Sequence, residues 1–428
     1  MVDVTVVCYS DVCYTGICYR DGSHVVFIGS HSHHFAALHL SSGDVIWRVQ
    51  LGGRIEGSAC LSKCARFVMV GSYDGCLYVL EALTGDIYWQ FQTGAEVKSS
   101  PCVDPTNGHV YFGSHDHCLH ALDVLKQTVM WRLELGGSVF SSPCVSLVPH
   151  CVYAATLGGS LSAVSPLHGT SLWRCMLGKP LFSSPVAIEL GVIIGCVDGA
   201  IYCVGHLGQK LWQHQTEAPV FSSPCASFSK SLHSGANQFI VFGSHDNHIY
   251  CIDGNGGLQW KLKVDSPVYS TPFVFPFNIS QHALGQRETP ILTQGSTHQT
   301  EFCHRQNSLK GSASVDTNKS KLSGSLIGRT ALENNRQKCL TRDRETVSTG
   351  IREKHDCAHL VAACSTRGRL YIVTLTSGRV MASYQFPGET FSSPVVLASD
   401  TGFDVIVGCR DDFVYCLKYK RLSELIQT

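Results

Sequence analysis

Short apolar runs separated by turn residues recur through most of the chain. In one typical unit the apolar runs are residues 102–103, 109–113, 118–122 and 128–133. Such runs are rich in β-branched and aromatic residues and are bounded by Gly, Asn, Asp and Ser, which is typical of β-strands joined by turns. Sustained helical periodicity is not found in any stretch. The pattern therefore predicts an all-β chain built from four-stranded units.

Tryptophan occupies the same position in successive units. The six tryptophans are spaced by 42, 42, 42, 39 and 48 residues, and a Ser-Ser-Pro or Ser-Thr-Pro sequence repeats in step. A period near 42 residues is typical of propeller blades. In a seventh copy we expect Tyr384 to take the place of tryptophan. The repeat residues are Trp47, Trp89, Trp131, Trp173, Trp212 and Trp260, with Pro101, Pro143, Pro185, Pro224, Pro272 and Pro394.

A Gly-Ser-x-Asp turn, or a variant of it, occurs eight times, whereas the strand with the tryptophan position occurs seven times. An open array of blades would leave unpaired strand edges, which natural sheets avoid. The ring would close if residues 4–8 supplied the fourth strand of the last blade. The sequence therefore favours a β-propeller of eight four-stranded blades, with seven as the alternative, closed by pairing of the N- and C-terminal strands.

The repeat divides the chain into five segments. Residues 1–20 form an irregular N-terminal segment that could hold the closing strand. Residues 21–278 hold blades 1 to 6 and the start of blade 7, and residues 357–418 hold the end of blade 7 and blade 8. Residues 279–356 are polar and rich in Ser, Thr, Asn and Gln, so we expect a disordered surface insertion. Residues 419–428 form a tail.

The polar residues of the repeat are interpreted as architecture. A short carboxylate in the turn can accept a hydrogen bond from the backbone two residues further on, and a tryptophan can be buried between adjacent blades. Histidines also cluster at the turns, but turns of different blades are splayed apart, so we predict no metal site. The turn aspartates are Asp74, Asp116, Asp198, Asp246 and Asp411.

Catalytic motifs are missing from the sequence. It contains no Gly-x-Ser-x-Gly elbow, Walker loop, dinucleotide fingerprint or zinc-protease motif. Leu157–Leu161 is similar to the phosphopantetheine site of carrier domains, but its register places it in a turn of the repeat. We therefore predict no catalytic, cofactor-binding or metal-binding residue in this chain.

Composition narrows the classes of partner and the compartment. The net charge is zero, so no global electrostatic field favours nucleic acid or an anionic membrane, and neither is expected as a partner. No apolar run is long enough for a transmembrane helix, and no basic region precedes the first apolar residues as in a secretory signal. The 21 cysteines lie in strand-like runs, which is typical of reduced core thiols. These features predict a cytoplasmic protein.

Several motifs resemble known propellers. Residues 74–80 and 84–89 resemble the pyrroloquinoline-quinone-type, or tryptophan-docking, propeller repeat, and the resemblance extends over about residues 25–275 and 360–418. Four segments are similar to the C-terminal propeller of the animal β-alanine-activating enzymes, which belong to the acyl-CoA synthetase family and are related to aminoadipate-semialdehyde dehydrogenase. These segments are Ile28–His33, Ala155–Gly159, Leu177–Pro185 and Ile194–Gly199.

This resemblance implies an ATP-dependent acid–thiol ligase of acyl-CoA-synthetase type. In that family an adenylation domain uses ATP to activate β-alanine, and a carrier domain holds the product as a thioester on phosphopantetheine. Neither domain matches this chain, so ATP and phosphopantetheine are expected only for domains outside it. The expectation is a non-catalytic recognition or docking module that binds a protein or small molecule on one rim. The alternatives are a quinone-dependent dehydrogenase and an independent protein-interaction scaffold.

Overall fold

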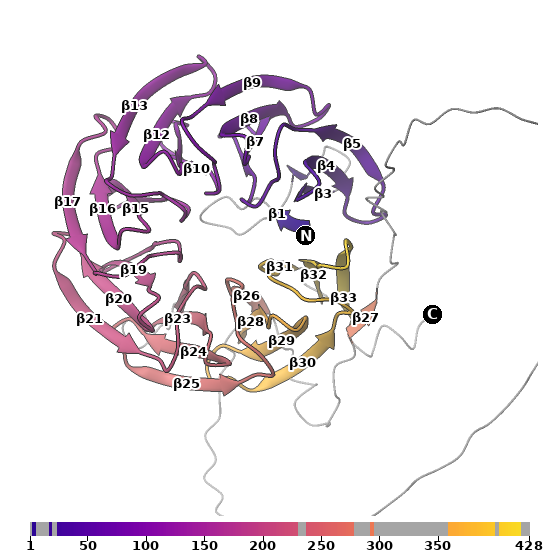
Figure 1. Cartoon of the computed structure of the whole chain (residues 1–428). Helices are drawn as coiled ribbons and strands as arrows, with labels where there is room; N and C mark the ends of the chain where they lie inside the picture. Colours follow the sequence, from indigo (N-terminus) through magenta and orange to yellow (C-terminus); the bar gives the residue numbers. More distant parts are fainter. Residues whose placement is uncertain are drawn as a thin grey trace, which may run out of the picture. The chain divides into compact units, whose positions relative to one another are not determined.

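The computed structural model describes residues 2–5, 17–18, 24–229, 237–277, 292–294, 358–398 and 402–420. These residues form eight antiparallel sheets arranged in a ring (Figure 1). The all-β class and the eight-bladed propeller are thereby confirmed. Among the described residues no helix is long and apolar enough to cross a membrane.

Blades 1 to 4 follow one another in chain order. Within each blade the strands run from the channel outward, and Figure 1 shows β5, β9, β13 and β17 on the outside of the ring. Blade 1 contains β1 (Val2–Thr5), β2 (Ile17–Cys18), β3 (His24–Ser30), β4 (His34–His39) and β5 (Val45–Gln50); blade 2 contains β6 (Cys60–Leu61), β7 (Phe67–Gly71), β8 (Cys76–Glu81) and β9 (Ile87–Gln92); blade 3 contains β10 (Cys102–Val103), β11 (Val110–Gly113), β12 (Cys118–Asp123) and β13 (Thr128–Glu134); blade 4 contains β14 (Cys144–Leu147), β15 (His150–Ala155), β16 (Ser160–Val164) and β17 (Ser171–Met176).

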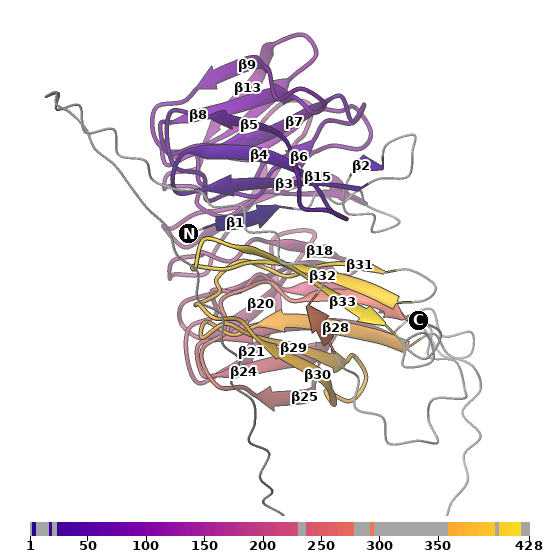
Figure 2. The same cartoon turned by 90° about the vertical axis from the view of Figure 1, so that its right-hand side faces the viewer.

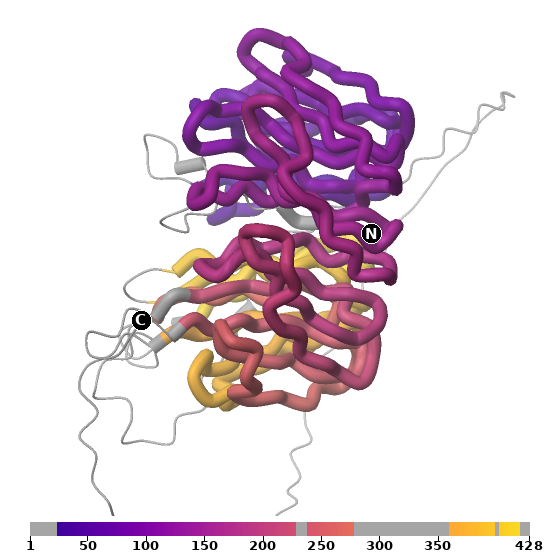
Figure 3. The backbone as a smooth tube through the Cα atoms, turned by 90° about the vertical axis from the view of Figure 1, so that its left-hand side faces the viewer, coloured from indigo at the N-terminus to yellow at the C-terminus, as the bar shows by residue number. Residues whose placement is uncertain are grey.

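Blades 5 to 8 complete the ring, and the tube in Figure 3 shows the hairpins repeating from blade to blade. Blade 5 contains β18 (Val186–Ile188), β19 (Gly191–Gly195), β20 (Ala200–Gly205) and β21 (Lys210–Gln215); blade 6 contains β22 (Cys225–Ser229), β23 (Asn237–Ser244), β24 (His248–Asp253) and β25 (Leu258–Lys263); blade 7 contains β26 (Phe273–Phe277), β28 (Ala358–Cys364), β29 (Arg369–Thr374) and β30 (Val380–Gln385); blade 8 contains β31 (Val395–Ala398), β32 (Gly402–Gly408), β33 (Val414–Lys420) and β27 (Leu292–Gln294).

The core lies between neighbouring blades. The two middle strands of a blade are buried along most of their length, as in β11 and β12, because both of their faces pack against adjacent sheets. The outer strand alternates between more and less exposed residues, as in β21. A β-bulge interrupts the pairing of the third and fourth strands at the same point in each of blades 1 to 7, for example after Ala121, which pairs with Trp131. This repeated bulge sets the direction of the tryptophan side chain.

The ring closes differently from the sequence prediction. The N-terminal strand β1 pairs with β3 in blade 1, and Figure 2 shows it between β3 and blade 8. Blade 8 instead receives its fourth strand, β27, from the segment predicted to be a disordered insertion, because Leu292–Gln294 pairs with β33. The predicted closure by the N-terminal strand was therefore wrong. The insertion between β26 and β28 is long enough to reach the exposed edge of β33, and β1 covers the inner edge of β3.

The register of blade 7 corrects a second expectation. Ala382 pairs with Ile372 immediately before the bulge, at the position that Trp260 holds opposite Cys251 in blade 6. Tyr384 lies two residues further along the strand, opposite Leu370. Alanine, and not Tyr384, therefore occupies the tryptophan position of blade 7.

Candidate functional site

The tryptophans of the repeat join each blade to the next. The indole of Trp131 packs against Gly169 of blade 4, where an added Cβ atom would lie 2.5 Å from its Cδ2 atom. Gly169 has a φ of 64°, a conformation that glycine adopts without strain. The indole N–H also donates to a backbone carbonyl of the next blade. These bonds are Trp47 to Ala82 (2.9 Å), Trp131 to Pro166 (2.8 Å), Trp173 to His206 (2.8 Å), Trp212 to Gly254 (3.0 Å) and Trp260 to Leu375 (2.7 Å).

Trp89 faces a variant of this arrangement. Gln127 holds the docking position in blade 3, with a positive φ of 54°. Here Tyr88 Oη donates to the Leu125 carbonyl (3.3 Å), and Gln127 Nε2 donates to the Tyr88 carbonyl (3.4 Å). This interface therefore keeps the backbone shape of the others but not the glycine.

The turn aspartates hold the hairpins between the second and third strands of the blades. In every one of the five turns, Oδ1 accepts the backbone N–H two residues further on. Oδ2 accepts a second donor four residues further on, which is a tyrosine hydroxyl in four blades; Tyr202 and Tyr250 bond at 2.6 Å. Blade 3 differs because His120 Nε2 lies 3.0 Å from Asp116 Oδ2. The carboxylates thus stabilise all five turns, and in blade 3 the second partner is a histidine instead of a tyrosine.

The Ser-Ser-Pro segments line the centre of the ring. Their prolines are buried, and the first serine staples the segment to its own blade, as when Ser99 Oγ accepts from Gly113 N (2.7 Å). The second serine links neighbouring blades, because Ser142 Oγ accepts the N–H of Ser100 (3.0 Å). Equivalent bonds join Ser58 to Ser100, Ser142 to Ser184, Ser184 to Ser223 and Thr271 to Ser393. The hydroxyls that make these bonds are therefore occupied by backbone partners.

A cavity of about 650 Å³ opens at the centre of the ring, and we call it the channel mouth. One side is an arc of half-buried rings from the residue that precedes each Ser-Ser or Ser-Thr pair. Their centroids lie 5.3 to 5.9 Å apart in sequence around the ring. We call this set the aromatic arc; it consists of Phe140, Phe182, Phe221, Tyr269 and Phe391.

The other side of the channel mouth is charged. Glu56 and Lys98 hold the positions that the aromatic arc holds elsewhere. Tyr73 donates its hydroxyl hydrogen to Glu56, and its ring lies 3.8 Å from the Arg54 guanidinium carbon and 4.6 Å from Lys98 Nζ. The channel mouth therefore has one apolar wall and one wall with charges of both signs.

Histidines from three turns lie at or near the channel mouth: His31 lines it, and His115 and His245 contact rings of the aromatic arc. Burial lowers the pKa of His31, His115 and His245 below the usual 6.5, so these imidazoles are neutral at pH 7. His115 and His245 each have a buried Nε2 atom without a hydrogen-bond partner among the described residues. The ring of His245 packs at 4.5 Å from that of Phe221, which extends the aromatic arc.

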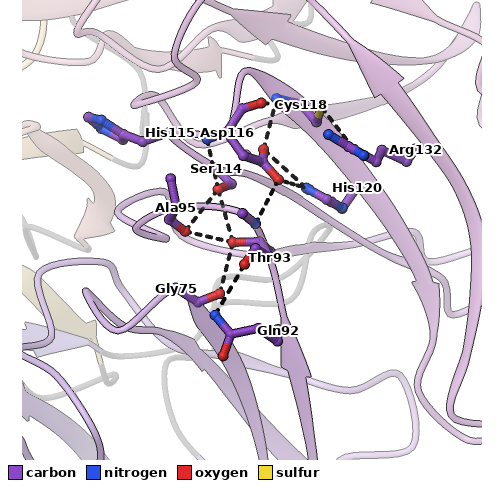
Figure 4. Close-up of polar contacts among 12 residues, drawn as sticks. Gly75, Gln92, Thr93, Ala95, Ser114, His115, Asp116, Cys118, His120 and Arg132 are labelled. Atoms are coloured by element: carbon purple, nitrogen blue, oxygen red, sulfur yellow. Dashed lines mark hydrogen bonds and ion pairs between the residues drawn. The ribbon is translucent and has the colours of Figure 1, made fainter.

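One turn brings three potential metal ligands together. Asp116, Cys118 and His120 of blade 3 each offer one atom, and these atoms all lie within 4.8 Å of one another. Figure 4 shows them beside Arg132, with His115 pointing away. We call this set the blade 3 cluster. Of the three, only Asp116 was predicted from the sequence as a repeat position, although Asp-x-Cys-x-His at the start of a strand places the three residues on one face of it.

The buried thiols described in the structure are poor nucleophiles. Burial raises the pKa of Cys203 to about 12 and also raises the pKa of Cys118. Within the part of the chain that the structure describes, the sequence-predicted residues do not form a nucleophile–base pair at the channel mouth. The tryptophans lie between blades, the prolines are buried at the channel, where Pro272 and Pro394 line its mouth, and the aspartates lie in the turns.

Comparisons with known proteins give a family and a fold. Residues 12–318 match the family model described as the β-alanine-activating enzyme, β-propeller. Curated relatives named β-alanine-activating enzyme include those of Homo sapiens (52% identical over 58 residues), Mus musculus (45% over 58) and Danio rerio (44% over 59). Each alignment covers 14% of this chain and 5% of the relative.

Two solved structures are similar over nearly the whole chain. The computationally designed Ika8 protein has a TM-score of 0.60 at 13% identity and covers 97% of this chain and 96% of its own. BamB from Moraxella catarrhalis has a TM-score of 0.59 at 11% identity and covers 99% of this chain and 98% of its own. At these identities the similarity shows the propeller fold alone.

Proposed function

This chain belongs to the family of the β-alanine-activating enzyme β-propeller, and we propose that it is a non-catalytic recognition module of an enzyme of that kind. The enzyme would be a cytoplasmic, ATP-dependent ligase whose adenylation and carrier domains lie outside this chain. The module would dock a partner domain or the acceptor of the activated acyl group.

The channel mouth is the observation that carries this proposal. A cavity of about 650 Å³ is within the range of ligand-binding pockets. Its aromatic arc offers rings that can bury an apolar side chain or chain segment, and aromatic residues dominate the energetics of such contacts. The opposite wall, with Glu56 and Lys98, can orient a charged group, and Arg54 supports Glu56 by an ion pair of 3.5 Å. The pocket therefore suits an extended segment with an apolar group at one side and a charged group at the other.

The same geometry supports a binding role over a catalytic one. The hydroxyls that line the cavity, such as those of Ser100 and Ser142, accept backbone N–H groups of the preceding blade. A serine nucleophile needs an adjacent base, and no base is hydrogen-bonded to these two hydroxyls in the described part of the chain. His115 and His245 are neutral and held by burial near aromatic rings.

Calorimetric titration of the full chain with the adenylation and carrier domains of the human relative tests the proposal. We expect saturable binding that Phe182→Ala and Phe221→Ala each weaken on the order of tenfold, because buried aromatic anchors contribute most to such interfaces. Leu125→Ser is the matched control: it replaces a residue that is 62% exposed in the turn at the other end of its strand from the aspartate turn.

Four results would count against this function. Absence of binding would remove the docking role, and an effect of Leu125→Ser alone would move the docking surface to the opposite face. A stoichiometric complex with added pyrroloquinoline quinone and Ca²⁺ that reduces a dye would instead favour a quinone-dependent dehydrogenase. Binding with unchanged affinity in both phenylalanine variants would favour a scaffold that does not use the channel mouth.

A further inference from the structure

The blade 3 cluster combines three ligand types on one short segment. Asp116 lies in the turn, and Cys118 and His120 are alternate residues of β12, so all three side chains face the same side of the sheet. Their ligand atoms lie within 4.8 Å of one another. The side chains of Asp116 and His120 are only 7% and 3% exposed, and Cys118 is 1% exposed. The cluster is thus a preassembled and shielded set of oxygen, sulfur and nitrogen donors.

The other blades show that the turn does not require this combination. Blade 2 has Asp74, Cys76 and Tyr78 at the same positions, and Tyr78 donates to the aspartate. Blades 5, 6 and 8 also place a tyrosine four residues after the aspartate. Among the five turns with this aspartate, blade 3 is the one that pairs a cysteine with a histidine. A tyrosine is enough to hydrogen-bond the aspartate in the other blades, so the turn alone does not explain the histidine in blade 3.

The surroundings fix the position of the imidazole beside the other two ligand atoms. The ring of His120 is stacked on Phe112 at 5.1 Å and meets the edge of Phe91 at 5.7 Å. Its Nε2 atom lies 3.0 Å from Asp116 Oδ2. The Nδ1 atom is buried without a hydrogen-bond partner among the described residues, so no hydrogen bond from Nδ1 to those residues fixes the orientation of the ring.

Arg132 is the positively charged side chain that would lie next to a bound metal ion. Its Nε donates to Cys118 Sγ at 3.0 Å and favours the thiolate, while its side chain is exposed. An exposed guanidinium can turn toward solvent when a cation takes its place beside the sulfur. Blade 2 has Gln90 at this position, and its Nε2 lies 3.0 Å from Cys76 Sγ.

We propose that Asp116, Cys118 and His120 bind one divalent transition-metal ion, with Zn²⁺ as the best fit to a carboxylate–thiolate–imidazole set. Binding releases the thiol proton to solvent and moves the imidazole proton from Nε2 to Nδ1, so that Nε2 becomes the ligand. Three protein ligands leave the fourth tetrahedral position to water, on the side from which Arg132 withdraws. The site lies apart from the aromatic arc and does not depend on the docking function.

Titration of the metal-free full chain with Co²⁺ tests the proposal, because Co²⁺ bound by a thiolate gives a sulfur-to-metal charge-transfer band. We expect one equivalent in the wild type, loss of the band in Cys118→Ser, and no change in the control Cys76→Ser. His120→Tyr copies blade 2 and should keep the fold while removing the band. Zn²⁺ should raise the Tm of the wild type and not that of His120→Tyr.

Transfer of the site provides the converse test. Tyr78→His gives blade 2 the same three residues as blade 3, so a second equivalent of Co²⁺ is expected. Arg132→Gln, which copies Gln90, should tighten binding because it removes a competing positive charge. Absence of a stoichiometric band in the wild type, or its retention in His120→Tyr with native circular dichroism, would overturn the proposal. A single equivalent in Tyr78→His would show that these three side chains do not suffice.

Discussion

The six successive interfaces that join blade 1 through to blade 7 differ in design from the two interfaces that close the ring. The closing interfaces lie between blades 7 and 8 and between blades 8 and 1. Five of the first six have an indole that packs on a glycine and donates to a carbonyl of the next blade. The interface between blades 7 and 8 has Ala382 at the tryptophan position. The interface between blades 8 and 1 has β27 as its outer strand, and the sequence of β27, Leu-Thr-Gln, contains no tryptophan.

Packing without a directed hydrogen bond replaces the indole at closure. Phe403 is central to the interface of blades 7 and 8: its ring lies 5.0 Å from Phe275, 5.4 Å from Phe277 and 4.6 Å from Tyr419. The interface of blades 8 and 1 is aliphatic and includes Ile28 and Ile406. A tryptophan contact specifies one geometry, whereas apolar packing tolerates small shifts. The two closing interfaces can therefore accommodate the small shifts that are needed when the ring closes.

The largest effect is expected for loss of a docked indole. Trp260 is 9% exposed and donates to the Leu375 carbonyl at 2.7 Å. Trp260→Ala should lower the free energy of unfolding by about 3–5 kcal/mol, measured by urea denaturation. Trp260→Phe keeps most of the apolar contact but leaves the carbonyl without its donor, so it should still cost about 1–3 kcal/mol. A loss below about 1 kcal/mol in the alanine variant would contradict the distinction between the two regions.

The closing interface should respond to volume and not to polarity. Phe403→Ala should cost about 3 kcal/mol, because it empties the centre of the aromatic contacts. Phe403→Leu should cost less than about 1.5 kcal/mol, since an apolar side chain can repack there. Thermal or urea unfolding of both variants measures the difference. Equal losses for leucine and alanine would show that this interface is as specific as a docked tryptophan.

The repeated blades and the closing elements also differ in how far the sequence predicts them. The blade count, the strand order within a blade and the turn aspartates follow from local residues that repeat, such as Trp131 and Asp116. The closing strand β27 could not be predicted, because pairing of Leu292–Gln294 with β33 depends on where the ends of the ring meet in space. Tyr384 was assigned to the tryptophan position because it is the aromatic residue of that strand, although Ala382 lies four residues after Gly378, as Trp89 lies four residues after Gly85.

The candidate sites divide in the same way. The aromatic arc is visible in the sequence as the residue before each Ser-Ser or Ser-Thr pair, but its role depends on the ring that brings Phe182 and Phe221 together. The blade 3 cluster has a local signal, since Asp116, Cys118 and His120 alternate along one strand. That signal was missed because the histidines were compared between blades, where they are far apart, and not within one blade.

The variant interface between blades 2 and 3 offers a smaller, stabilising test. Gln127 has a φ of 54° at the position where the other blades have glycine. A non-glycine residue in this conformation costs about 1–2 kcal/mol, so Gln127→Gly should stabilise the protein by about 1 kcal/mol. The reverse change, Gly169→Gln, should destabilise it more, because its Cβ atom would lie 2.5 Å from Trp131 Cδ2. A destabilised Gln127→Gly variant would mean that the Gln127–Tyr88 bond outweighs the backbone strain.

The smallest expected effect is a pH dependence of the free energy of unfolding, which arises in the blades of the tryptophan repeat. Burial lowers the pKa of His31, His115, His120 and His245 below 6.5, and all four lie in blades 1, 3 and 6. In the described parts of blades 7 and 8 the sequence has one histidine, His359. Because the unfolded chain binds protons more readily at the four buried sites, their contribution to stability is present above pH 6.5 and declines as the pH falls through 6.5 toward the folded-state pKa.

Unfolding by urea at pH values of about 7.5 and about 5.5 measures this decline, and both values lie above the range in which Asp and Glu titrate. His115→Phe removes one titrating group from a site beside Phe140, where the Nε2 atom has no hydrogen-bond partner among the described residues. The stability lost between the two pH values should therefore be smaller in His115→Phe than in the wild type, while His359→Phe in blade 7 serves as the matched control. An equal loss in all three proteins would contradict the role of His115 in the acid sensitivity, because removal of a group whose pKa is lowered by folding must reduce the proton uptake that accompanies unfolding.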